Sequence, residues 1–127
     1  MTSVRIGQIL AGILALVLAG FGMFYLINPE AAAAARGVVP QGDYGMTNVR
    51  IMGAPLLAFA LMAAIGAKTK NFVFVAPAAL YFLFVIIIRI VGIFADGAHP
   101  DTTKGLILAG VLFVVAEVAL QLFKRAK

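Results

Sequence analysis

The chain contains no cysteine and a single histidine, His99. The absence of cysteine excludes disulfides, thiol catalysis and cysteine-based metal sites. One histidine also excludes a histidine-rich metal site and a haem held by two histidines of the same chain. We therefore predict no metal ion and no cofactor.

Charged residues are also scarce: they make up 12% of the 127 residues, while 64% are hydrophobic. Soluble domains are normally about one quarter charged, and one of this length could not bury so much apolar surface. The net charge of +5 is typical of nucleic-acid binding. However, the basic residues lie at the ends of apolar runs rather than on one face. We therefore assign them to membrane topology and expect no nucleic acid.

Apolar runs of roughly twenty residues recur along the chain, which is the length that a spanning helix needs. The expected spans cover about residues 4–27, 48–67, 72–94 and 105–123. The first run is too long for the core of a signal peptide and no cleavage site follows it, so we retain it as a span. We find no domain boundary. The sequence therefore predicts one all-α domain over residues 1–127, an integral membrane four-helix bundle.

Local signals predict how the first two spans are connected. Asn28-Pro29 ends the first run, and the segment EAAAAAR (30–36) has the pattern of a short amphipathic or surface helix. A turn-rich loop follows. Thr47-Asn48 then offers an N-cap for the second span.

Two further features concern the spans themselves. Pro77 predicts a slight break in the third span. Along the first span, small or polar residues recur at spacings of three and four, and such residues let neighbouring helices approach closely. This stripe consists of Gln8, Gly12, Ala15, Ala19 and Gly22. We expect it to face the other helices of the bundle.

Four spans place both chain ends on the same side of the membrane. That side holds Arg5, Lys68, Lys70, Lys124, Arg125 and Lys127. The other side holds Arg36, Arg50 and Lys104, beside the acidic Glu30, Asp43, Asp96 and Asp101. Because cytoplasmic loops carry an excess of basic residues, we predict that both termini are cytoplasmic and that the longer loops lie outside.

Ionisable side chains also fall inside the predicted spans or close to their ends. Arg89 lies about 8 Å below the outer end of the third span, and Arg50 about 5 Å below that of the second. Asp96 follows Arg89 by about two helical turns on the same face. Glu117 lies roughly 18 Å below the outer end of the fourth span. A charge inside the bilayer costs about 3 kcal/mol or more, so each of these groups is expected to face protein or water.

Two interpretations of these groups are open. In the first they only hold the bundle together, Arg89 pairing with Asp96, and Glu117 pairing with Gln8, Gln121 or Tyr81. In the second they line an outward-opening intramembrane pocket that binds a ligand. The predicted binding residues are Asn48, Arg50, Tyr81, Arg89, Asp96, Glu117 and Gln121.

Several of these polar residues form an ordered set along the chain. The set is Asn48, Arg50, Gly53, Arg89, Asp96-Gly97, Pro100 and Glu117. In this order it resembles the short four-span membrane proteins of domain-of-unknown-function family 4345, which are similar in layout to the DoxX-like group. The resemblance covers the chain from about Gly20 onward. It implies a four-span bundle in the bacterial inner membrane, and it implies no particular activity.

We therefore expect a small membrane protein whose pocket binds a lipophilic small molecule or lipid, with Arg50 and Arg89 meeting an anionic or carbonyl head group. One alternative is an accessory or assembly subunit of a larger membrane complex, with a membrane protein or a second copy of the chain as its partner. A second alternative is an isomerase or cyclase that uses Glu117 for proton transfer. Only Tyr81 lies at a similar depth to assist Glu117, so we assign no catalytic residue.

Overall fold

A computed structural model describes residues 3–97 and 100–125, so that His99 lies outside the described residues. The described residues form helices and no strand. The helices are α1 (Ser3–Ile27), α2 (Pro29–Ala35), α3 (Gly42–Ile51), α4 (Ala54–Thr69), α5 (Phe72–Asp96) and α6 (Pro100–Arg125). Four segments are long and apolar enough to cross a membrane: Ser3–Ile27, Gly42–Thr69, Phe72–Asp96 and Thr102–Arg125. The predicted all-α, four-span fold is confirmed.

The second span begins earlier than the sequence signals predict. Helix α3 already starts at Gly42, whose φ of 65° turns the chain out of the preceding loop. Asn48 therefore lies inside α3 with an exposed side chain, and the prediction that it caps the span is wrong. The interruption comes at Met52–Gly53 instead, because Pro55 cannot donate a backbone hydrogen bond and suits the first turn of α4.

The third and fourth spans also differ from the prediction. Helix α5 passes through Pro77 without a break. A proline near the start of a spanning helix removes only one backbone donor, and neighbouring groups can compensate for it. Helix α6 begins at Pro100, so the segment up to Lys104, which we expected to be loop, forms its first turns.

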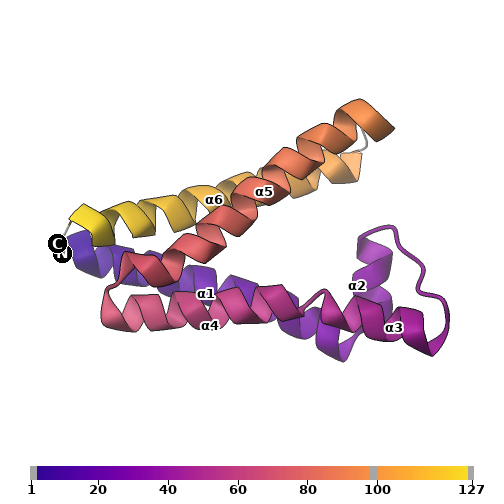
Figure 1. The fold of residues 1–127 in the computed structure, drawn as a ribbon, viewed down its shortest axis with the longest axis horizontal. Helices are drawn as coiled ribbons and strands as arrows, with labels where there is room; N and C mark the ends of the chain where they lie inside the picture. Colours follow the sequence, from indigo (N-terminus) through magenta and orange to yellow (C-terminus); the bar gives the residue numbers. More distant parts are fainter. Residues whose placement is uncertain (1–2, 98–99, 126–127) are drawn as a thin grey trace.

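The helices pack as two pairs, α1 with α4 and α5 with α6 (Figure 1). Helices α1 and α6 also pack against each other, as do α4 and α5. The beginning of α1 and the end of α6 lie at the same end of the molecule, and α2 and α3 lie at the opposite end (Figure 1). Toward that opposite end the two pairs diverge. Small buried residues such as Ala11, Ala63, Ala78 and Ala116 let the helices approach closely in the packed half.

The stripe predicted on the first span is only partly buried. Ala15 and Gly22 are buried, but an added Cβ at Gly12 would meet no atom within 4 Å. Gly22 of α1 lies against Gly53, which precedes α4. A Cβ at Gly53 would lie 2.6 Å from the Gly22 carbonyl oxygen. The two backbones therefore touch at this crossing.

Candidate functional site

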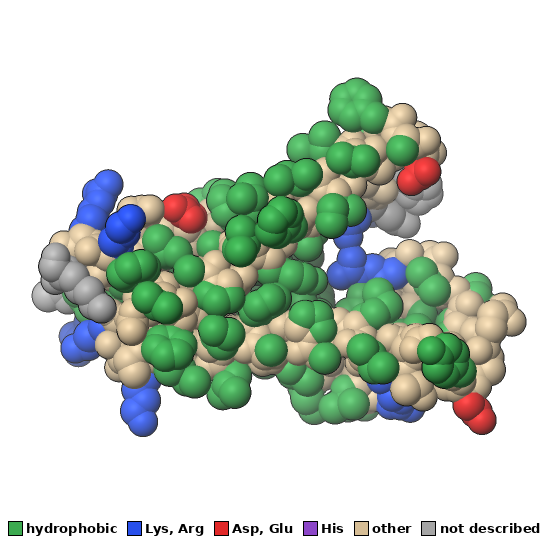
Figure 2. Space-filling view, viewed as in Figure 1, with side chains coloured by type: hydrophobic (Ala, Val, Ile, Leu, Met, Phe, Trp, Pro, Cys, Tyr) green, Lys and Arg blue, Asp and Glu red, His purple; other side chains and the backbone are tan. Residues whose placement is uncertain are grey.

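A cavity of about 360 Å³ lies between the diverging helix pairs. Figure 2 shows it as a hollow in the surface, with Lys and Arg side chains inside it. Helices α1, α2, α4, α5 and α6 all contribute to its walls. Most of the wall is apolar and includes Leu18, Phe24, Leu56, Phe82, Val85 and Leu112.

The polar groups of the cavity are cations and tyrosines. Arg36, Arg89 and Lys104 line it together with Tyr25 and Tyr81. None of the described side chains that line the cavity is acidic. None of the charged residues in the described part of the chain is fully buried, so each cation keeps some access to the cavity or to the outside.

Arg89 reaches the cavity from the C-terminal half of α5. Its guanidinium lies against α6 at Gly105, where an added Cβ would be only 2.7 Å from Cζ. The Nε atom is buried and has no hydrogen-bond partner among the described residues. A planar guanidinium has five N–H donors in a fixed geometry. The Nε atom is sealed from solvent, so only the two terminal nitrogens of Arg89, which form no hydrogen bond with a described residue, can meet a ligand.

Arg36 reaches the cavity from the end of α2, and Tyr25 of α1 holds it in place. Its Nε donates a hydrogen bond of 2.6 Å to the Tyr25 hydroxyl. Its Cζ also lies 5.9 Å from the centre of the Tyr25 ring, within the range of a cation–π contact. Because Tyr25 is only 4% exposed, it is a firm anchor. The remaining guanidinium donors of Arg36 have no described partner.

Tyr81 lies deeper on α5 and is held by aromatic contacts. Its ring centre is 5.0 Å from that of Phe59 and 5.3 Å from that of Phe82. These distances are typical of favourable aromatic pairs. Tyr81 is half-buried and lines the cavity.

The structure brings Arg89 and Tyr81 to the cavity but not the other predicted binding residues. Arg50 donates a hydrogen bond to the carbonyl of Leu26, at the end of α1. Asp96 is exposed at the end of α5, and no ion pair joins it to Arg89 among the described residues. Asn48 is exposed on α3. The pairing of Arg89 with Asp96 that the sequence suggested is therefore not present.

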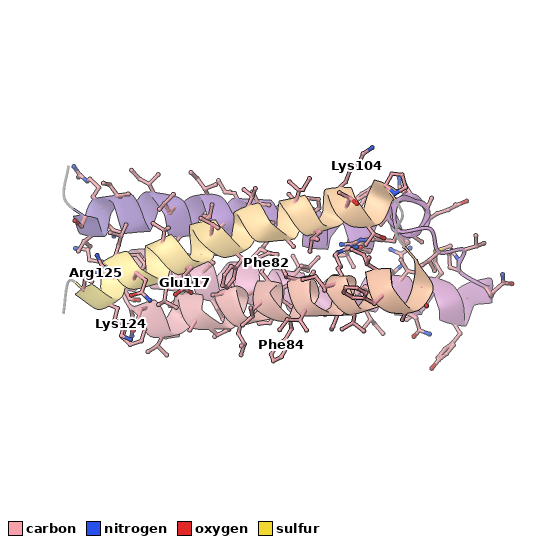
Figure 3. The ribbon with its side chains drawn as sticks, turned by 90° about the horizontal axis from the view of Figure 1, so that it is seen from above. Phe82, Phe84, Lys104, Glu117, Lys124 and Arg125 are labelled. Carbon is pink, nitrogen blue, oxygen red and sulfur yellow. The ribbon has the colours of Figure 1, made fainter. Side chains whose placement is uncertain are left out.

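Glu117 and Gln121 lie toward the other end of the molecule. Figure 3 shows Glu117 near Lys124 and Arg125, far along α6 from Lys104. Gln121 donates a hydrogen bond of 3.0 Å to the Glu117 carboxylate, as one of the predicted pairings suggested. Gln8 instead donates to the carbonyl of Ala67 at 2.8 Å. Since Glu117 follows Lys104 by thirteen residues, about 20 Å of helix separates it from the cationic end of the cavity.

Arg36, Lys104 and Tyr25 were not among the binding residues predicted from the sequence. Arg36 and Lys104 were assigned to membrane topology, because each lies at the predicted outer side of a span. The only sequence signal for Arg36 was its place at the end of the alanine-rich helix. Its position at the cavity depends on the contact with Tyr25, eleven residues earlier in the chain.

Comparison with known proteins adds no further constraint. The chain matches no family model, and no curated protein or solved structure was found to be similar to it. The resemblance to family 4345 therefore stays a prediction.

Proposed function

We propose that this protein binds a lipophilic small molecule or a lipid in the cavity between its two helix pairs. The observation that supports the proposal is the cavity itself, with its apolar walls and a few convergent polar groups. Ligand sites typically have this composition and a volume of about 300–1,000 Å³, and the cavity volume of about 360 Å³ falls in that range.

The proposal does not extend to catalysis. Acid–base chemistry requires the acid within hydrogen-bonding reach of the substrate, directly or through one water. Glu117, the deep carboxyl that the sequence analysis considered, does not line the cavity. Of the groups considered for proton transfer, only Tyr81 does. Binding is therefore the function that the arrangement supports best.

We further propose that the protein lies in the bacterial inner membrane with both termini in the cytoplasm. The charge distribution supports this orientation, because basic residues flank the helix ends that lie together at one end of the bundle (Figure 1): the start of α1, the turn between α4 and α5, and the end of α6. These residues are Arg5, Lys68, Lys70, Lys124 and Arg125. The cavity then lies in the outer half of the bilayer.

The test is to purify the protein in discs of native lipid and to identify by mass spectrometry what remains bound. A stoichiometric lipophile is expected in the unmodified protein. Val85→Trp places a large side chain in the cavity, so this variant should no longer retain the lipophile. The control is Val91→Trp on the same helix, where the side chain is 58% exposed and does not line the cavity. Equal retention in both variants would contradict the proposal. A co-purifying protein with no small molecule would favour the accessory-subunit alternative.

A further inference from the structure

Two guanidinium groups at the cavity have no acidic partner among the described side chains. Arg36 uses its Nε for Tyr25, and Arg89 has no hydrogen-bond partner among the described residues, although its Nε is buried. The exposed Lys104 adds a third positive charge at the same end of the cavity. Like charges repel more strongly where protein and lipid lower the dielectric. An anion bound between them would remove this repulsion.

We infer that the ligand of the cavity is a single-chain amphiphile with an anionic head, whose oxygens are bound by Arg36 and Arg89. This inference builds on the proposed binding function and specifies its ligand class. Guanidinium groups match carboxylate and phosphate oxygens through two parallel hydrogen bonds, so either head satisfies the unused donors. The ligand class is therefore a carboxylate or phosphate head on an apolar tail.

The tail follows from the walls of the cavity. Beyond the two arginines the wall includes the apolar side chains of Phe82, Val85, Leu112 and Leu18, from three of the contributing helices. A free anion would leave this apolar volume without contacts. An amphiphile fills it, and its tail gains roughly 25 cal/mol for each Å² of apolar surface that leaves water.

The contact between Arg89 and Gly105 allows the role of Arg89 to be tested by a substitution that leaves every charged residue in place. Gly105 leaves just enough room for its guanidinium, and a Cβ there would come within 2.7–2.9 Å of the guanidinium atoms. Gly105→Ala is therefore expected to displace the end of this flexible side chain and leave the fold intact. Gly110→Ala on the same helix is the matched control, because nothing lies within 4 Å of its Cβ position.

The experiment measures binding of four probes to the delipidated full-length protein in a neutral detergent, by native mass spectrometry. The probes are palmitate, a lysophosphatidic acid, the neutral monopalmitoylglycerol and inorganic phosphate. We expect both anionic amphiphiles to bind about tenfold or more tightly than the neutral one. Inorganic phosphate should not compete. Comparison of palmitate with the lysophosphatidic acid shows which head the site prefers.

The variants distinguish the proposed binding function from the proposed anionic class of ligand. Arg89→Gln and Gly105→Ala should each remove most of the preference for anionic heads and leave binding of the neutral probe unchanged, whereas Gly110→Ala should change nothing. Equal binding of neutral and anionic amphiphiles, lost in Val85→Trp, would overturn this inference and leave the proposed function standing. Competition by inorganic phosphate at equal affinity would also overturn it. If no amphiphile binds, both proposals fail.

Discussion

Arg50 and Arg89 lie in different environments, although both belong to long apolar segments. Arg50 turns to the end of α1, where it donates to the Leu26 carbonyl. The last turn of α1 has no basic residue of its own, and its last carbonyls lack partners within the helix. Arg89 instead lies at the cavity, with its buried Nε unpaired. The first arginine thus has a structural role, and the second is available to a ligand.

Arg50→Ala should therefore reduce stability without reducing ligand binding. Loss of a hydrogen bond to a helix C-terminus, together with a favourable charge there, costs about 1 kcal/mol in the free energy of unfolding. Thermal unfolding in detergent, followed by circular dichroism, measures the effect. Arg125→Ala is the control, since Arg125 is exposed at the end of α6. An unchanged melting temperature, or loss of the bound lipophile from a fully stable variant, would contradict the capping role.

At the scale of elements, α1 and α4 cross with their backbones in close contact at Gly22 and Gly53. A Cβ at Gly22 would lie 2.7 Å from the Leu57 side chain and 3.2 Å from the Gly53 carbonyl. The side chain of Leu57 can move, but the Gly53 backbone cannot do so without shifting the whole helix. This crossing therefore fixes how far the two helices approach.

Gly22→Val should destabilise the bundle by about 1–3 kcal/mol, the usual cost of overpacking. Gly12→Val, on the same helix with open space around its Cβ position, should leave stability unchanged. Both variants are compared by thermal unfolding in detergent. If Gly12→Val dissociated a co-purifying partner, the open part of the stripe would be an interface with another protein, as the accessory-subunit alternative requires.

The contrast between these glycines shows what sequence periodicity can and cannot predict. Apolar run length was enough to find the four spans, because the bilayer sets the length of a spanning helix. A spacing of three and four identifies one face of a helix, yet it does not say where a neighbouring helix crosses that face. Gly12 and Gly22 therefore received the same prediction and have different environments.

Sequence patterns also predicted only some of the residues that line the cavity. Arg89 and Tyr81 were predicted because polar groups inside an apolar run are conspicuous. Arg36 was not predicted, because it lies at the end of the short helix α2, outside the spans. It reaches the cavity only because it contacts Tyr25 of α1. Glu117 was conspicuous for the same reason as Arg89. Its depth along α6 nevertheless places it beside Gln121, away from the cavity.

On the scale of the whole molecule, the chain ends lie at one end of the bundle (Figure 1), and the cavity opens toward the other end (Figure 2). The orientation of the protein in the membrane therefore decides on which side the arginines meet a ligand. The basic residues near the chain ends predict that these ends are cytoplasmic. In that orientation Arg36 and Arg89 would lie near the head groups of the outer leaflet, and the proposed ligand would enter from that leaflet.

The absence of cysteine makes the orientation directly testable, because a single introduced thiol is the only one in the chain. Tyr44 of α3 is 80% exposed and lies at the cavity end, while Lys70 is exposed in the turn between α4 and α5. In spheroplasts, a membrane-impermeant maleimide should label Tyr44→Cys at once and Lys70→Cys only after permeabilisation. Each variant is the control for the other. The reverse pattern would place the cavity on the cytoplasmic side, and its anionic ligand would then come from the inner leaflet.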